Sequence, residues 1–349
     1  MVANADGAKI LFQKPCRQGK QEVLLVSSLR RIVKNVAYGL ADALNVTGLC
    51  RKTRKDALTI VTYHSFGPAE EYPYLHRLAP GKLSAQLDHL GRHYDVVPLQ
   101  EGLMRLERLQ GAALDRPMVA ITVDDGFADN YDYLFPALRT RGLPASIFVA
   151  TDFLDTDRLP WPTRIDYLLR YARNRNVRAP IAVNLETVNA GVARRVLYRH
   201  FSRLSGFERQ EALEALETAM APQGPTQAPP LSWAQVREMQ ASGVSFGSHT
   251  RFHGWLDLLS PEEVGAELSY SRERIEAEAG ECPMLAYPNG NWSADVVRAA
   301  AKAGYTYALT QDHGVSRAGG APPLALPRIQ VPHDETLSVF ACRVAGVAL

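Results

Sequence analysis

The run Met118-Val119-Ala120-Ile121-Thr122-Val123-Asp124-Asp125-Gly126 decides the fold of this chain. Its first six residues are apolar or β-branched, which is typical of a strand buried on both faces. Two carboxylates follow at the carboxyl end of that strand, where α/β barrels and open α/β sheets carry their chemistry. Gly126 permits a sharp turn, and we expect a helix from Phe127 to Leu138 that runs up to Gly142.

A second polar run, Ser248-His249-Thr250-Arg251-Phe252-His253, follows the short strand-like stretch Val244-Ser245-Phe246-Gly247. The two histidines are four residues apart and begin the next loop or helix; if the segment is helical, both lie on one face. One Asp and two His supply the three ligands of a zinc-like site with an open position. The remaining Asp is then left to act as a general base.

Each motif alone has an ordinary interpretation. Paired Asp residues often cap helices or form turns, and a lone His-x-x-x-His pair is frequently incidental. Their occurrence together, in this order and at strand ends, favours a metal-dependent hydrolase.

Five segments in order resemble the polysaccharide deacetylases with a NodB-homology domain, carbohydrate esterase family four, and the resemblance covers about residues 58–340. Leu58–His64 ends in Tyr-His, as in the bacterial exopolysaccharide branch. Thr122–Gly126 is similar to Thr-Phe-Asp-Asp-Gly with Val in place of Phe, and Ser248–His253 is similar to the His-Ser/Thr-x-x-His motif. In chain order the segments are Leu58–His64, Thr122–Gly126, Ser248–His253, Ala286–Gly290 and Leu326–Ile329.

The resemblance implies a role for each matched residue. Asp124 would be the base. The metal ligands would be Asp125, His249 and His253. The backbone N–H of Asn289 would help to bind the oxyanion, and substrate would be bound by Tyr287, Pro288 and His64.

Two family features are missing. Many members begin the motif that matches Ala286–Gly290 with an Arg that contacts the catalytic carboxylate, and Ala286 stands there. Arg328 is a candidate replacement, against the equal alternative of a structural or surface arginine. The Leu-x-His motif that supplies the general acid is not evident. His313 is the candidate acid, with His333 and His64 as substitutes, and a plain structural role competes for each.

Strand-like and helical runs alternate along the chain, which is typical of a parallel α/β fold. The resemblance narrows the fold to a distorted, incomplete (β/α) barrel. It implies removal of N-acetyl groups from N-acetylhexosamine units of a glycan or glycolipid. Zn²⁺ is the favoured ion, with Co²⁺, Mn²⁺ and Ni²⁺ as alternatives. A carbohydrate O-acetyl esterase and a glycan-binding pseudoenzyme are the competing functions. The missing Arg and Leu-x-His favour the pseudoenzyme, and the intact metal set opposes it.

Three parts of the chain are expected. Residues 1–56 form a basic segment, and residues 57–349 form the catalytic domain. An insertion at about 155–230 contains charged helices, the strand-like run Ile181–Leu185 and a return loop rich in Pro and Gln.

The basic segment predicts an amphipathic helix. Residues 1–55 contain 11 Lys/Arg and three Asp/Glu. Apolar residues repeat with helical spacing over residues 23–49. Such a helix either contacts an anionic membrane, here through residues 23–55, or packs against the catalytic domain.

Composition sets the remaining expectations. A hydrophobic content of 46% and a net charge of +2 over 349 residues suit a globular protein. No transmembrane run or secretory signal is evident, and the scattered cysteines suggest a reducing compartment. We therefore expect a cytoplasmic protein, with peripheral contact to the inner membrane face as an option. Nucleic acid is not expected as a partner, because no phosphate loop or aromatic-studded basic groove is evident.

Overall fold

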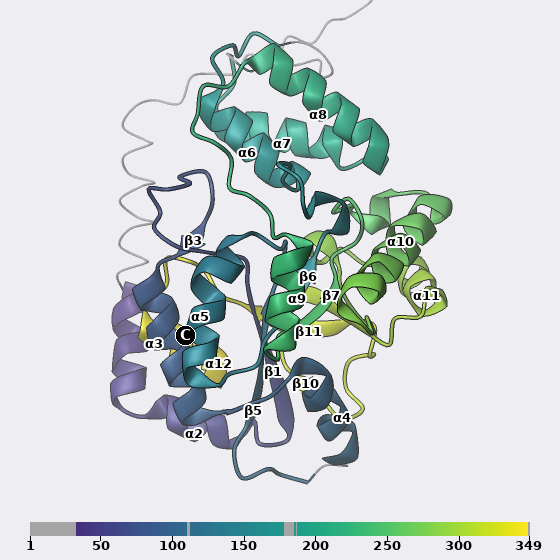
Figure 1. Ribbon diagram of the computed structural model, residues 1–349. Helices are drawn as coiled ribbons and strands as arrows, with labels where there is room; N and C mark the ends of the chain where they lie inside the picture. The colour runs from purple at the N-terminus through teal and green to yellow at the C-terminus, as the bar shows by residue number, and fades with distance from the viewer. Residues whose placement is uncertain (1–32, 110–111, 178–184, 186, 348–349) are drawn as a thin grey trace, which may run out of the picture.

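The computed structural model describes residues 33–109, 112–177, 185 and 187–347. Its centre is a closed ring of seven parallel strands (Figure 1). β1 closes the ring by pairing with both β5 and β11. Because a complete (β/α) barrel has about eight strands, the expected incomplete barrel is confirmed. In order around the ring the strands are β1 (Ala57–Tyr63), β5 (Met118–Val123), β6 (Ser146–Val149), β7 (Ser245–Ser248), β8 (Met284–Ala286), β9 (Tyr307–His313) and β11 (Leu326–Gln330).

The first two strands of the ring set the position of the carboxylates. Every residue of β1 and β5 is buried, as their apolar sequences predict. Their register pairs Leu58 with Met118 and Tyr63 with Val123. His64 and Asp124 therefore leave the barrel at the same edge. Outside the ring, the described residues also form the short strands β2 (Ser65–Phe66), β3 (Arg77–Leu78), β4 (Asp95–Val96) and β10 (Ser316–Arg317).

Helices surround the barrel (Figure 1). The helix expected after Asp-Asp-Gly begins with a π-helical turn, Asn130–Leu134, and continues as α5 (Phe135–Arg141). It ends at Gly142 in the left-handed conformation, φ 60°. The other surrounding helices are α3 (Pro80–His93), α4 (Leu99–Leu109), α9 (Trp233–Ala241), α10 (Pro261–Ala279), α11 (Ala294–Lys302) and α12 (Leu337–Ala345).

In the segment predicted as an insertion, the described residues form α6 (Trp161–Tyr171), α7 (Ala190–Phe201) and α8 (Gly206–Met220), which lie together at the top of Figure 1. They enclose a hydrophobic cluster of their own, with Trp161, Leu197 and Leu216 fully buried. The segment returns to the barrel beside the Asp-Asp-Gly turn, where the Leu231 N–H donates to Gly126 O at 2.8 Å. Of the strand-like run Ile181–Leu185, only Leu185 lies within the described residues.

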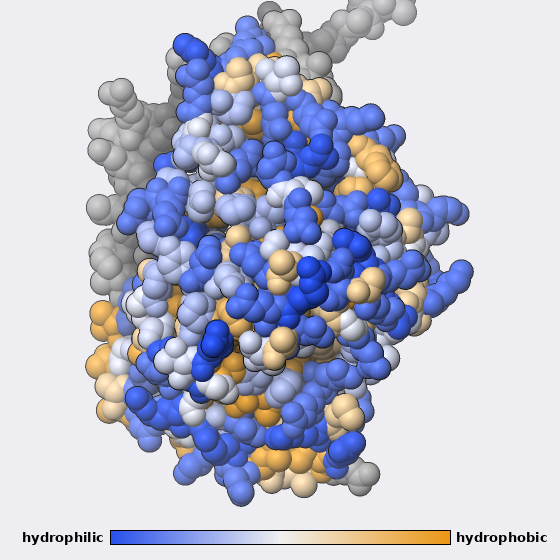
Figure 2. All heavy atoms as spheres, viewed as in Figure 1, coloured by the Kyte–Doolittle hydropathy of each residue, from blue (hydrophilic) through white to orange (hydrophobic). Residues whose placement is uncertain are grey.

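The described part of the basic segment packs on the domain. Residues 33–43 are helical, α2 (Val46–Lys52) follows, and Tyr38 and Ala41 are buried beside Val339 and Cys342 of α12. Residues 23–32 of the expected helix lie outside the described part. Several apolar side chains remain exposed, and Figure 2 shows hydrophobic atoms at that edge of the molecule. They are Val33, Val36, Leu40, Leu44 and Leu49.

The structure thus supports packing against the domain, while membrane contact stays a prediction. In the described ranges, no helix is both long enough and apolar enough to cross a membrane. Cys50, Cys282 and Cys342 are free thiols, and Cys16 lies outside the described residues. The division at residues 56 and 57 also stays a prediction.

Candidate metal centre and active site

The turn after β5 is held in an unusual backbone conformation. Asp125 and Gly126 both have positive φ, 76° and 73°. A Cβ on Gly126 would lie 2.9 Å from Val149 Cγ1, so glycine is required there on two grounds. A left-handed aspartate costs backbone energy and is found where the surroundings enforce it, often at functional sites. The turn places the Asp125 carboxylate beside the two histidines.

Asp125, His249 and His253 converge as the sequence predicted. Asp125 Oδ1 lies 3.4 Å from His249 Nε2 and 3.3 Å from His253 Nε2. Their candidate ligand atoms lie within 4.8 Å of one another. One carboxylate oxygen and two imidazole nitrogens are the ligand types that zinc and similar ions accept.

The hydrogen bond on the far side of His249 supports a cation at this centre. His249 Nδ1 lies 2.7 Å from the Ala286 carbonyl oxygen. Because a carbonyl only accepts, Nδ1 must carry the hydrogen, and in the neutral ring the Nε2 lone pair then faces Asp125. Two acceptors at this separation require a proton or a metal ion between them. The three residues therefore fit a divalent ion.

Burial and mutual contacts set the charge states of the three residues. Burial opposes ionisation of Asp125, but its side-chain contacts with His249 and His253 outweigh burial and hold its pKa well below the usual value. The same contact with Asp125, together with the charge of Asp124, raises the pKa of His249 against the effect of burial. Burial lowers the pKa of His253, which favours the neutral, metal-binding form of its ring.

The two histidines do not share a helix. Residues 249–253 form a loop, with Thr250 and His253 at positive φ of 67° and 56°. The helical option considered for their spacing is therefore wrong, and the loop brings the rings to a centroid distance of 4.9 Å. Glu267 of α10 holds this loop, because its buried Oε2 accepts the N–H groups of Arg251 and Phe252, each at 2.8 Å.

Glu267 should therefore influence metal affinity without touching the metal. We expect Glu267→Met to weaken metal binding by about 10- to 100-fold, the usual effect of losing a residue that orients ligands. Glu267→Gln keeps an acceptor oxygen and should retain most of the affinity. Titration calorimetry with Zn²⁺ measures both variants. Glu276→Met, on the exposed side of the same helix, is the control, and equal losses at positions 267 and 276 would contradict this role.

Asp124 forms a fully buried ion pair with Arg328. Arg328 Nη1 donates to Asp124 Oδ1 at 2.8 Å, and Nη2 donates to Oδ2 at 2.7 Å. Both side chains have zero exposure. The guanidinium is fixed by further hydrogen bonds from Nε to Thr310 O and from Nη1 to Thr62 Oγ1. Arg328, on β11, therefore contacts the carboxylate of Asp124, as expected if it replaces the arginine that is missing at Ala286.

The ion pair controls the charge of Asp124. Burial is the largest single effect and would raise the pKa of this carboxyl group, but the charge and hydrogen bonds of Arg328, together with the nearby His249 and His64, outweigh burial and lower it. Asp124 is therefore ionised at neutral pH. Each carboxylate oxygen accepts one hydrogen bond from Arg328 and keeps a second lone pair for another donor.

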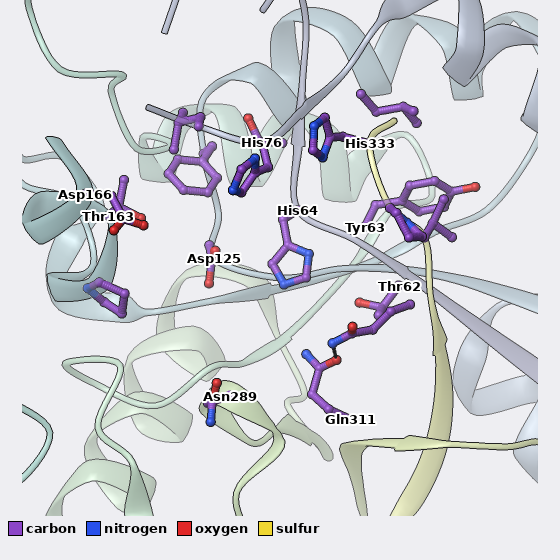
Figure 3. A pocket seen from close by; sticks show the side chains of 18 of the residues that line it. Thr62, Tyr63, His64, His76, Asp125, Thr163, Asp166, Asn289, Gln311 and His333 are labelled. Carbon is purple, nitrogen blue, oxygen red and sulfur yellow. Dashed lines mark hydrogen bonds between the residues drawn. The ribbon is translucent and has the colours of Figure 1, made fainter. Parts of the chain in front are cut away.

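A cavity of about 500 Å³ lies over this centre. Figure 3 shows Asp125, His64 and Asn289 on its walls, with the His64 ring directed into it. His249, His253 and His333 also line it, and the His333 ring stacks on His76 with centroids 4.8 Å apart. Asn289 has a left-handed backbone, φ 58°.

Other predicted residues lie elsewhere. Tyr287 is packed in the core and its hydroxyl donates to Leu324 O, and Pro288 is also buried; neither is among the described residues of the cavity wall. His313 is exposed at the end of β9 and is not brought to the cavity. Asp124 and Arg328 are fully buried and are not among the described residues that line the cavity.

The inserted helices approach the centre more closely than the sequence indicated. Trp161 Nε1 of α6 donates to the carbonyl oxygen of His253 at 3.0 Å. Asp166, Arg194 and Tyr198 line the same cavity. No motif in the sequence singled out these residues or Glu267.

An incomplete parallel barrel with an Asp-His-His cluster at its strand ends defines a NodB-type protein. The family model for polysaccharide deacetylase matches residues 111–308, more than half of the chain. The chain belongs to the polysaccharide deacetylase family, within carbohydrate esterase family four.

Similar proteins support this assignment. The Bacillus subtilis (strain 168) protein YxkH, provisionally named as a polysaccharide deacetylase, is 22% identical over 301 residues, covering 85% of this chain and 79% of that protein. The structure of IcaB from Ammonifex degensii has a TM-score of 0.55 and 19% identity, covering 83% of this chain and 96% of its own. The structure of Streptococcus pyogenes deacetylase PplD in complex with acetate has a TM-score of 0.53 and 19% identity, covering 80% of this chain and 93% of its own. These likenesses confirm the fold.

Family membership supports carbohydrate deacetylation, which is hydrolysis of an acetyl group from an acetylated carbohydrate. Deacetylases of this family are metal-dependent. Asp125, His249 and His253 are the described residues positioned to hold the ion.

Proposed function

We propose that this protein is a metal-dependent hydrolase that removes N-acetyl groups from N-acetylhexosamine units of a glycan or glycolipid. The observation that carries the proposal is the Asp125-His249-His253 cluster on the wall of a cavity, next in sequence to Asp124 of the fully buried Asp124–Arg328 pair. A sugar amide can enter the cavity, while the buried ion pair supplies a fixed carboxylate beside the metal ligands. Zn²⁺ suits the ligand set best, with Co²⁺, Mn²⁺ and Ni²⁺ as alternatives.

When bound, a divalent ion polarises the acyl carbonyl and lowers the pKa of a water molecule. The chain supplies the acid–base groups and the positioning. Asp124, ionised by its pairing with Arg328, accepts the proton of the attacking water through its remaining lone pairs. Arg328 fixes the orientation of that carboxylate. The backbone N–H of Asn289, on the cavity wall, donates to the developing oxyanion.

We propose that His64 is the general acid, which donates a proton to the leaving amine. Its ring extends into the cavity beside Asp125 (Figure 3), and its carbonyl oxygen accepts a hydrogen bond from Asn130 Nδ2 at 3.0 Å, which fixes the backbone there. His249 and His253 belong to the metal cluster. His313 lies at an exposed strand end, so the geometry favours His64 over the acid first considered.

His64→Gln tests this role. We expect a loss of about 10²- to 10⁴-fold in turnover of an N-acetyl sugar and a much smaller loss for an aryl acetate, whose leaving group needs no proton. His76→Gln changes another histidine of the same wall and is the control. The assignment fails if His64→Gln affects amide and ester equally, or if the selective loss follows His76 or His333.

Metal analysis followed by acetate release tests the proposed function. We expect about one divalent ion per chain, acetate release from N-acetylated sugars, and loss of release on chelation with recovery on adding Zn²⁺. Release from O-acetyl sugars alone would identify a carbohydrate esterase. A protein that binds glycans but releases no acetate when loaded with metal would be a pseudoenzyme, and the proposal would be wrong.

A further inference from the structure

The inserted helices build one wall of the cavity from groups suited to a sugar. Thr163 and Asp166 lie on α6, and Arg194 and Tyr198 lie on α7. Figure 3 shows Thr163 and Asp166 on the side of the cavity next to Asp125. Trp255, which follows the histidine loop, lines the same wall. These side chains therefore face the same space as the metal centre.

The polar groups on this wall are held rigidly. Arg194 Nε donates to Asp166 Oδ1 at 2.6 Å, and Nη2 donates to Oδ2 at 2.9 Å. Nη2 also donates to the Tyr198 hydroxyl at 2.7 Å, and the guanidinium stacks on the Tyr198 ring at 4.4 Å. Three of the five guanidinium N–H groups are thus used within the described residues, which leaves two for a ligand.

Aromatic side chains complete the wall. Tyr198 and Trp255 lie 6.2 Å apart, and both contact the buried ring of Trp161. Trp255 Nε1 is buried and has no hydrogen-bond partner among the described residues, so this wall contains an unsatisfied polar group, which is uncommon in folded proteins. A pyranose ring combines apolar C–H faces with hydroxyl groups at its edge, and this wall offers partners for both.

The charge of the wall indicates which sugars fit. Asp166 neutralises Arg194 through two hydrogen bonds, so the pair has no net charge. Neutral hydroxyl groups suit such a pair better than a uronate or phosphate, which would need an unpaired cation. About half of the Arg194 side chain and a quarter of Asp166 are exposed, so the pair is accessible.

We infer that the cluster Asp166-Arg194-Tyr198-Trp255 binds a second, neutral sugar ring next to the acetylated one. This inference rests on the proposed deacetylase function and makes an oligosaccharide, rather than a monosaccharide, the preferred substrate. The cavity of about 500 Å³ lies within the range of roughly 300–1,000 Å³ typical of ligand pockets. A direct hydrogen bond joins the subsite helix α6 to the metal loop, from Trp161 to His253 O.

Substrate length provides the test. With N-acetylglucosamine and its linear tetramers in several linkages, we expect wild-type kcat/KM to be higher for at least one tetramer. Arg194→Met should raise KM for that tetramer by roughly tenfold, from the loss of charge-assisted hydrogen bonds, and leave the monomer within about twofold. Tyr198→Phe, which keeps the ring, should give a smaller change of the same kind. Arg141→Met removes a matched pair with Asp88 away from the cavity and should change neither substrate.

Binding provides a readout that does not depend on turnover. Trp161 and Trp255 lie beside the cluster, so tryptophan fluorescence should report tetramer binding, about tenfold weaker in Arg194→Met. If the wild type binds tetramer but releases no acetate, the proposed function fails and the subsite stands. If Arg194→Met and Tyr198→Phe fold but lower monomer and tetramer kinetics equally, or change neither, the subsite is refuted.

Discussion

Asp124→Asn should reduce turnover of an N-acetyl sugar by about 10²- to 10⁴-fold, the usual contribution of a general base. The amide keeps the shape of the carboxylate but cannot take a proton from water. Metal content should stay close to one ion per chain, because Asp125, His249 and His253 are unchanged. Steady-state acetate release and metal analysis of the same sample measure the two effects.

Unfolding must be separated from lost chemistry, because Asp124 neutralises the buried Arg328. Glu335→Gln is the matched control: Glu335 is also buried and paired with an arginine, Arg343 at 3.1 Å, but is not among the described residues of the cavity wall. It should keep turnover near the wild-type value. A folded Asp124→Asn protein with full activity would remove Asp124 from the role of base.

Arg328→Met should produce the largest loss of stability. The methionine leaves the Asp124 carboxylate buried and unpaired, and breaking a buried pair in this way costs about 3–5 kcal/mol. Turnover should also fall, because Asp124 loses the charge that keeps it ionised. Urea unfolding monitored by circular dichroism measures the free energy of unfolding.

The pH dependence of stability gives a second measure of this pair. Arg328 lowers the pKa of Asp124 in the folded protein, so the pair stabilises the fold above the ordinary carboxyl range. That contribution is lost as the pH falls through the folded pKa. Arg343→Met, a half-buried arginine paired with Glu335, is the comparison. If Arg328→Met lowers the free energy of unfolding by no more than Arg343→Met does, the Asp124 pair is not a major stabilising contact.

The barrel and metal cluster could be predicted because their signals are local. The apolar run before Asp124 identified a buried strand, and β5 is buried throughout. The paired histidines after a strand-like stretch identified the other half of the cluster. Their loop conformation could not be predicted, because a spacing of four fits a helix equally well, and the positive φ of Thr250 and His253 depends on contacts with Glu267.

Long-range pairing limited the remaining site predictions. Arg328 could be proposed as a partner for Asp124 but not placed, since 204 residues separate them. Tyr287 was assigned to substrate from its motif alone, yet the chain turns at Pro288–Gly290 with Asn289 in the left-handed conformation, so the Tyr287 ring lies in the core while Asn289 lines the cavity. Arg194 and Asp166 lie on different helices, so no linear motif joins them.

The hydrogen bond from Leu231 to Gly126 has a consequence for how the centre assembles. Without it, Asp125 and His249 are the ends of one long flexible loop, whose closure costs conformational entropy. Pairing of Leu231 with Gly126 leaves the shorter stretch from Leu231 to His249 to close. We infer that this contact lowers the entropy cost of bringing the two halves of the metal centre together.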